Sequence, residues 1–201
     1  MDLHKNLILA SRSPRRLQLL KQIGMSPTVI PCDIPEVFDP SRSAEENASS
    51  LALQKALHVA REVPDGVVIG ADTIVVLGGE MLGKPDGPRD AVRMLRSLSG
   101  RTHSVVTGFA LVDRPSGRRT TGAERTDVTF RRLPAEEIEE YVAGGSPLDK
   151  AGAYGIQDDY GAVFVTRIEG CFYNVVGLPL SRFHTALQEF AADRSIAKEG
   201  Q

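Results

Sequence analysis

Apolar and polar residues follow two different periods along the chain, and these periods predict both strands and helices. Short apolar runs and two-residue alternation favour strands, whereas apolar residues every three or four positions favour helices. The expected strands cover residues 7–10, 28–31, 67–77, 80–82, 102–112, 125–133, 162–168 and 172–176. The expected helices cover residues 14–23, 43–60, 88–98, 134–142 and 180–190. Hairpins mixed with helices predict an α/β fold with a twisted mixed sheet and flanking helices.

Local signals refine this pattern. Ser43 and Glu46 have the spacing of a capping box at the start of a long helix. Neither a repeat nor a low-complexity linker interrupts the chain. We therefore expect a single domain over residues 1–193 and a frayed tail over residues 194–201.

Composition limits the partners of the protein. The 24 basic and 26 acidic side chains give a formal net charge of −2, which favours neither nonspecific nucleic-acid binding nor an anionic membrane. The apolar runs are far shorter than the ~20 residues of a membrane span, and no run of signal-peptide length opens the chain. Cys32 and Cys171 lack metal-ligand spacing. We expect reduced thiols in a soluble, cytoplasmic protein that binds anions only through a local cluster.

A candidate anion site follows the first expected strand. Residues 11–16 read Ser-Arg-Ser-Pro-Arg-Arg, with Ser13 as the expected N-cap and Pro14 as the first helical residue. Free N–H groups of the first turn would then lie beside Arg15 and Arg16, an arrangement suited to phosphate oxygens. The alternative is a solvated helix start whose arginines face water.

Carboxylates and lysines supply further candidates. Asp72, in the sequence Gly-Ala-Asp-Thr at the end of an apolar strand, can bind Mg²⁺ or orient water, although an aspartate there also suits a turn. Glu36 lies just beyond another strand, and Asp33 competes with it for the same role. Lys55 and Lys84 are two more cations, for which simple solvation is the alternative.

A third candidate segment covers residues 149–157. Its small residues allow close backbone approach, and Gln157 offers both a donor and an acceptor to a polar base edge. The alternative is a loop packed closely on the sheet. The four histidines are scattered without ligand or triad spacing, and the P-loop pattern is absent.

Five stretches, taken together and in order, resemble the Maf family of nucleoside triphosphate pyrophosphatases. They are residues 9–16, 70–73, 82–85, 148–157 and 174–180, which extend over nearly the whole chain. The resemblance is to the branch that acts on dTTP and UTP. A sister branch, similar to a methylated-GTP pyrophosphatase, has Trp where Arg15 stands and Asp-Gln where Asp72 and Thr73 stand. The chain contains no tryptophan, which accords with pyrimidine substrates.

The resemblance implies a fold of the inosine-triphosphate-pyrophosphatase type (Maf/Ham1), with a central cleft, in a homodimer. It also implies cleavage between the α- and β-phosphates to a monophosphate and pyrophosphate, with a divalent metal, Mg²⁺ or alternatively Mn²⁺. The implied catalytic residues are Asp72, Glu36 and Lys84, with Asp72 as proton acceptor and with Glu36 and Asp72 as metal ligands. The implied phosphate-binding residues are Ser11, Arg16, Lys55 and Lys84, and those implied to select the base are Arg15, Thr73 and Gln157.

The chain departs from the family pattern after Gln157, where it reads Asp158-Asp159-Tyr160 instead of small residues. Added carboxylates near the base site make a pyrophosphatase of shifted base specificity one alternative. Another is a nucleotide-binding regulator of cell division or septum formation with little turnover. A triphosphate carries about four negative charges, so its binding requires cations and metal. Where these surround Glu36 and Asp72, both carboxylates should be ionised near neutral pH.

Overall fold

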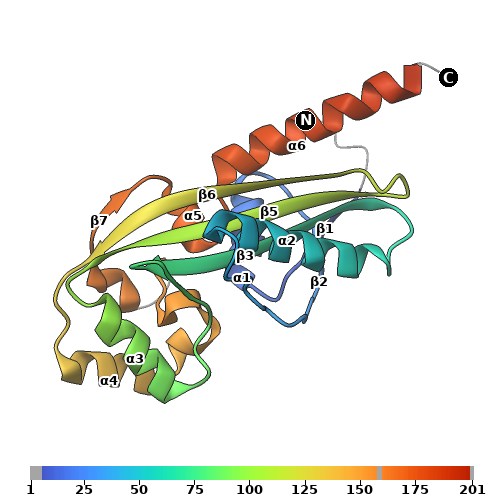
Figure 1. Ribbon diagram of the computed structural model, residues 1–201. Coiled ribbons are helices and arrows are strands. Elements are labelled where there is room, and N and C mark those ends of the chain that lie inside the picture. Colours follow the sequence, from blue (N-terminus) through green and yellow to red (C-terminus); the bar gives the residue numbers. More distant parts are fainter. Residues whose placement is uncertain (1–5, 158–159, 200–201) are drawn as a thin grey trace. The chain divides into compact units, whose positions relative to one another are not determined.

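The computed structural model describes residues 6–157 and 160–199, which form an α/β fold (Figure 1). The strands are β1 (Leu7–Ala10), β2 (Thr28–Ile30), β3 (Gly66–Leu77), β4 (Glu80–Leu82), β5 (Thr102–Arg114), β6 (Arg119–Phe130) and β7 (Val165–Glu169). The helices are α1 (Pro14–Gln22), α2 (Ala44–Ala60), α3 (Pro88–Leu98), α4 (Ala135–Ala143), α5 (Phe172–Val176) and α6 (Leu180–Glu199). Short 3-10 helices are η1 (Ser146–Asp149), η2 (Ala151–Ala153) and η3 (Tyr160–Phe164).

The strands confirm the predicted mixed sheet. Within the described residues they form one seven-stranded sheet in the order β2-β1-β3-β5-β6-β7, with β4 paired to β3. Strand β1 runs parallel to both β2 and β3. Strand β4 is antiparallel to β3, and β7 is antiparallel to β6. The sheet therefore combines parallel and antiparallel pairs of strands, as the mixture of hairpins and helices in the sequence predicted.

The chain divides into two compact units. The first contains the described chain up to Asp72, Thr107–Glu124 and the chain from Gly177 onward. The second contains Thr73–Val106 and Arg125–Val176. Strands β3, β5 and β6 contribute residues to both. The single domain expected from the sequence stays a prediction.

In the first unit, helix α2 lies unusually close to the sheet. A Cβ atom added at Gly70 in β3 would lie 2.1 Å from the carbonyl oxygen of Ala52, and one added at Gly108 in β5 would lie 2.3 Å from the carbonyl carbon of Ala48. Ala48, Ala52 and Ala56 are fully buried on the facing side of the helix. Glycine in the strands and alanine in the helix thus let backbone pack directly against backbone.

The start of α2 is held by the predicted capping box. The Ser43 Oγ accepts a hydrogen bond from the Glu46 N–H at 3.1 Å, and the Glu46 carboxylate accepts one from the Ser43 N–H at 2.7 Å. Both bonds satisfy backbone donors that the first helical turn leaves unpaired.

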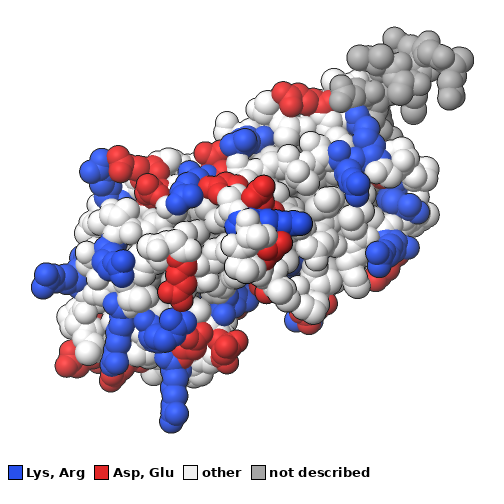
Figure 2. Space-filling model, in the orientation of Figure 1, with Lys and Arg blue, Asp and Glu red and all other residues white. Residues whose placement is uncertain are grey.

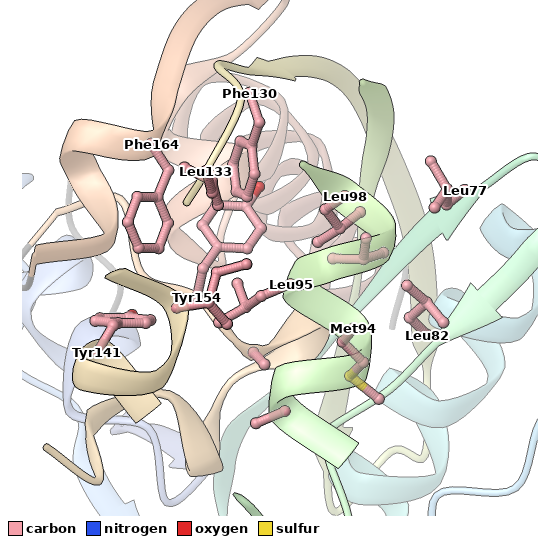
Figure 3. Packing of buried hydrophobic residues seen from close by; sticks show 14 of the residues in the cluster. Leu77, Leu82, Met94, Leu95, Leu98, Phe130, Leu133, Tyr141, Tyr154 and Phe164 are labelled. Carbon is pink, nitrogen blue, oxygen red and sulfur yellow. The ribbon is translucent and has the colours of Figure 1, made fainter. Parts of the chain in front are cut away.

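The second unit has its own aromatic core. Figure 3 shows the rings of Phe130, Tyr154 and Phe164 gathered beside helix α3. Phe130 meets Tyr154 edge to face, with ring centroids 4.7 Å apart. Leu95 and Leu98 of α3 are fully buried in the same cluster. Each large side chain buried in this way contributes roughly 1.5–3 kcal/mol of hydrophobic stabilisation.

His103, to which the sequence assigned no role, lies inside this core. It is 2% exposed, and its ring meets Phe130 and Tyr154 edge to face. Its Nε2 shares a hydrogen bond of 2.8 Å with the Tyr154 hydroxyl. Burial lowers the pKa of His103 from 6.5 to about 4, because the charged imidazolium would lose its hydration.

Two segments differ from their predicted structure. Residues 172–176, expected to be extended, form helix α5, in which the buried Asn174 side chain donates to the Val105 carbonyl oxygen and the Thr126 hydroxyl. The strand expected from residue 162 begins only at Val165, because Tyr160–Phe164 forms η3 and the Phe164 ring is fully buried. Short apolar runs suit a buried helix as well as a strand, so periodicity alone could not decide.

The ends of two elements also extend beyond their predicted bounds. Strand β6 begins at Arg119 instead of residue 125, over a polar stretch that only pairing within the sheet makes a strand. Helix α6 runs to Glu199, past residue 194 where we expected fraying. Residues 200–201 of that tail lie outside the described residues.

Charges of both signs are interspersed on the surface in view in Figure 2. Surface ion pairs include Arg96–Glu139 at 3.0 Å and Arg93–Asp90 at 2.8 Å, and such pairs add little to stability because water and salt screen them. Among the described residues, each helix is too short or too polar to cross a membrane.

We expect acid to destabilise the protein through His103. Between its ordinary pKa of 6.5 and the folded value of about 4, the unfolded chain binds a proton that the folded chain excludes, so stability falls as pH falls. Going from about pH 7.5 to about pH 4.5 should cost about 2.5 kcal/mol from this group. Urea unfolding across this range should show a smaller loss for His103→Gln, which keeps a polar partner for Tyr154. His184→Gln is the control and should retain the full loss; equal losses in parent and His103→Gln would refute the assignment.

Candidate active site

Asp72 lies within β3, as the strand expected over residues 67–77 implies, and not at a strand end, as its motif suggested. The strand continues through residues 73–77, because its last three residues pair with β4. Side chains alternate along a strand, so Asp72 points to the same face as Gly70, which is the face covered by α2. The aspartate is only 4% exposed. A turn-forming role is thereby excluded, and the carboxylate faces a helix.

Lys55 projects from α2 onto this carboxylate. Its Nζ donates to Asp72 Oδ1 and, at 2.7 Å, to Glu36 Oε1. The lysine is 6% exposed, which excludes simple solvation. Residues from a helix, a strand and the segment before α2 therefore form one charge cluster, the Lys55 cluster, which consists of the buried Lys55 and Asp72 and the half-buried Glu36.

The structure separates the two acids that competed for a place beside Asp72. Glu36 contacts the Lys55 ammonium, whereas Asp33 pairs with Arg12 at 3.0 Å with both side chains well exposed. Both acids follow the same strand, β2. Only the course of the backbone decides which of them turns inward.

The hydrogen bonds in the segment after β1 differ from the predicted ones. Pro14 is the first residue of α1, but the side chain of the N-cap residue Ser13 makes no capping hydrogen bond. The buried Ser11 hydroxyl instead accepts from the Ser13 N–H at 3.1 Å and from Arg16 Nη1 at 3.4 Å. Arg16 Nε donates to the Gly177 carbonyl oxygen at 2.9 Å. Two hydrogen bonds thus orient the Arg16 guanidinium, which is half-buried, as is Arg15.

Burial and charge oppose each other at these groups. Burial raises the pKa of Asp72 above its ordinary value, while Lys55 and then Arg16 lower it. Burial lowers the pKa of Arg16, and the negative charges of Asp72 and Glu36 counteract this. The expected ionisation of Asp72 near neutral pH therefore depends on its cations, because burial alone favours the protonated acid.

Two carboxylates of the Lys55 cluster, Glu36 and Asp72, are the candidate ligands for a divalent metal. Within the described ranges, 6–157 and 160–199, three or more acidic, histidine or cysteine side chains do not gather into a ready-made cage. Glu36 and Asp72 nevertheless converge on one point, the Lys55 ammonium. Mg²⁺ is commonly held by one or two carboxylates together with substrate phosphates and water. The donor set fits an ion that arrives with a phosphate ligand.

Three predicted site residues belong to the second unit. Thr73 follows Asp72 in β3 and points to the opposite face of the strand. Lys84, after β4, and Gln157, after η2, are both exposed. A hydrogen bond of 3.0 Å from the Gly152 N–H to the Gly83 carbonyl oxygen connects the two segments that carry them. That these three residues act with Ser11, Arg16 and the Lys55 cluster stays a prediction.

Sequence reasoning missed two contributions, both from glycine. The Gly177 carbonyl oxygen receives Arg16, although the sequence offered only the motif around it. Gly70 and Gly108 permit the close approach of α2. The sole signal for Gly70 was an unexpected glycine in an apolar strand, which typically marks close backbone approach.

The chain is similar to known proteins over nearly its whole length. The family described as Maf-like protein matches residues 6–190. The dTTP/UTP pyrophosphatase of Moorella thermoacetica is 50% identical over 187 residues, which cover 93% of this chain and 96% of that protein. The dTTP/UTP pyrophosphatase of Chlorobium luteolum is 47% identical over 188 residues, covering 92% and 96%. Among solved structures, the Staphylococcus aureus Ham1 protein matches with 18% identity and a TM-score of 0.45, over 63% of this chain and 72% of that one.

Gly70→Ala should displace α2 and weaken the Lys55 cluster. The new methyl group would lie 2.1 Å from a backbone oxygen, a contact that only a backbone shift relieves, at a cost of roughly 1–3 kcal/mol. Urea unfolding should show this loss, and activity should fall in the folded fraction. Gly87→Ala is the control, because a Cβ there meets nothing within 4 Å. Parent-like stability of Gly70→Ala would contradict the close approach.

Proposed function

Since this chain belongs to the Maf family, we propose that it is a nucleoside triphosphate pyrophosphatase, a hydrolase of acid anhydrides that acts on dTTP and UTP. It would cleave between the α- and β-phosphates and release a nucleoside monophosphate and pyrophosphate. Two relatives that are named dTTP/UTP pyrophosphatases support the assignment of these substrates. The observation that carries the chemistry is the Lys55 cluster, a buried ammonium between two carboxylates.

Positive charge around the phosphates is the main requirement of catalysis, and the basic side chains supply it. Pyrophosphate gathers negative charge as it leaves, so the transition state is stabilised by oriented positive groups. Arg16 is held by the Ser11 hydroxyl and the Gly177 carbonyl oxygen, which reduces the reorganisation that phosphate binding requires. In this proposal Ser11, Arg16, Lys55 and Lys84 bind the phosphates.

Asp72 is the proton acceptor in this proposal. The attacking water loses a proton as its oxygen bonds to phosphorus, and the anhydride oxygen leaves with pyrophosphate. Burial raises the pKa of Asp72, which makes the carboxylate a stronger base than an exposed aspartate. Lys55, bonded to the same carboxylate, holds its orientation.

Glu36 and Asp72 would hold the divalent metal, Mg²⁺ or alternatively Mn²⁺. Such an ion, when bound, neutralises phosphate charge and lowers the pKa of a coordinated water. Both carboxylates already contact a cation, the Lys55 ammonium. Phosphate oxygens would attract that ammonium and leave carboxylate oxygens for the metal.

Base selection is assigned to Arg15, Thr73 and Gln157. Hydrogen bonds to a pyrimidine edge reject a wrong base strongly, because a mismatched base leaves polar groups unpaired. Asp158 and Asp159, the departures from the family pattern, lie outside the described residues, and their effect on base choice stays a prediction.

The proposal includes a homodimer and a cytoplasmic location. The homodimer rests on the resemblance in sequence. The location is supported by two free thiols, the buried Cys32 and the half-buried Cys171, as is usual in a reducing compartment.

Asp72→Asn should abolish pyrophosphate release from dTTP and UTP and retain nucleotide binding. The amide keeps the size of the side chain but accepts no proton, so kcat should fall at least about 100-fold. Products from a panel of triphosphates with Mg²⁺ should be scored for pyrophosphate against orthophosphate. Dissociation constants are measured in parallel.

Asp65→Asn, at an exposed aspartate just before β3, is the matched control and should keep parental turnover. Orthophosphate as the sole product of the parent would refute cleavage between the α- and β-phosphates. Turnover by Asp72→Asn at the parental rate would refute the role of Asp72 as proton acceptor. A parent protein that binds nucleotides without turning them over would instead be the nucleotide-binding regulator.

Glu36→Gln should weaken binding of the metal, whereas Asp33→Asn should not. Loss of one of two carboxylate ligands should raise the Mg²⁺ concentration for half-maximal activity by about ten-fold. Asp33 pairs with Arg12 at the surface, so its amide variant is a matched control. Titration of Mg²⁺ at saturating dTTP makes the comparison, and equal shifts in both variants would contradict the choice of Glu36.

A further inference from the structure

One buried histidine in the second unit has an incomplete set of hydrogen bonds. In the described part of the chain, His103 Nδ1 is the one buried side-chain nitrogen or oxygen without a hydrogen-bond partner. Its other nitrogen, Nε2, contacts the Tyr154 hydroxyl at 2.8 Å. A polar group that is buried and only half satisfied costs stability, so a residue chosen for packing alone would more simply be apolar.

Tyr154, the partner of His103, lies near the end of a segment, residues 150–155, that is held at several points. Tyr154 is 6% exposed within the aromatic core (Figure 3). The next residue, Gly155, donates its N–H to the Tyr141 hydroxyl at 3.2 Å. Two consecutive residues are therefore held in place: Tyr154 by the bond of its own hydroxyl to His103, and Gly155 by the bond of its N–H to the Tyr141 hydroxyl. Gln157 follows two positions later and is exposed.

The backbone before Tyr154 also needs external support. Ala153 has φ 59°, a left-handed conformation that costs a non-glycine residue about 1–2 kcal/mol. Gly152 precedes it with φ 68°, and a Cβ there would lie 2.8 Å from a methyl group of Val75. The Gly152 N–H donates to the Gly83 carbonyl oxygen at 3.0 Å. Strained backbone of this kind persists only where surrounding contacts determine it.

Lys150 holds the beginning of the same segment. It is 8% exposed, and its Nζ donates to the Ser146 carbonyl oxygen, to the Ser146 hydroxyl at 3.3 Å and to Asp149 Oδ1 at 2.9 Å. Its bonds to its own neighbours indicate a structural ammonium. Residues 150–155 are thus held by side chains from both ends.

We propose that His103, Tyr141 and Tyr154 are positioning residues for base recognition. They hold the backbone directly ahead of Gln157, so that its amide meets the base in one orientation. The inference rests on the proposed function, in which Gln157 contacts the base. Hydrogen bonding discriminates between bases only where the protein group is held in place, because a mobile amide adapts to a wrong base.

Tyr154→Phe and Tyr141→Phe test the proposal by removing one hydroxyl each and keeping the ring. The readout is base selectivity, the ratio of kcat/KM for dTTP to that for CTP. Selectivity should fall about five-fold in each variant, the effect of losing one neutral hydrogen bond. The change should come mainly from KM, while kcat for dTTP stays within about two-fold. Unchanged selectivity in both variants would overturn the proposal.

A double-mutant cycle identifies the route of the effect. If Tyr154 acts through Gln157, then Tyr154→Phe should reduce selectivity no further in a Gln157→Ala background. Independent effects that multiply would show that the tyrosine acts elsewhere, and the proposal would fail. Ser97→Ala is the control for a hydroxyl lost in the same unit, since its Oγ donates to the Met94 carbonyl oxygen within α3. Selectivity reduced equally by Ser97→Ala would also overturn the proposal.

The same variants can be compared by binding alone. In the Asp72→Asn background, the ratio of dissociation constants for CTP and dTTP should fall about five-fold when either tyrosine is changed. This readout stands even if the parent fails to release pyrophosphate, in which case the proposed function fails and the positioning role does not. A ratio unchanged by both tyrosine variants refutes the positioning role, whatever the catalytic result.

Discussion

The close approach of α2 to the sheet is the constraint on which the candidate site depends. Gly70 and Gly108 leave no Cβ atoms between the strands and the helix, and the alanines of α2 fill the interface. Lys55 lies on that helix, and Asp72 lies two positions after Gly70 on the facing strand. The distance between two backbones thereby determines whether an ammonium and a carboxylate meet, because neither side chain can adjust freely once buried.

Burial makes the charges of the Lys55 cluster interdependent. Removing a carboxylate or an ammonium from water costs several kcal/mol, and Lys55 compensates by bonding to both Asp72 and Glu36. Arg16 stabilises the same negative charge from α1. A polyanionic ligand would exchange one set of ionic contacts for another, so the arrangement suits phosphate chemistry better than permanent structural use.

Features that depend on residues close in the sequence could be predicted, whereas features that depend on distant residues could not. The capping box of α2 was predicted because Ser43 and Glu46 are three residues apart, and the β3–β4 hairpin because a Gly-Gly turn joins its strands. Helix α5 was not, because Asn174 hydrogen-bonds to β5 and β6. Ser13 is the N-cap residue as predicted but makes no side-chain capping bond, and Arg16 is instead oriented by Ser11 and by Gly177, which is too distant in the sequence for a local pattern to reveal.

The sequence by itself determined the α/β class, the mixed sheet and the chemical types gathered in its motifs, since these follow from local periods and from residue identity. Only the tertiary structure decided between Glu36 and Asp33, placed Asp72 against Lys55, and gave His103 and Tyr154 a shared core. The reason is physical. Residue types determine which interactions are possible. The packing of the backbone decides which polar groups are buried next to each other, and buried polar groups must pair because they have lost their contacts with water.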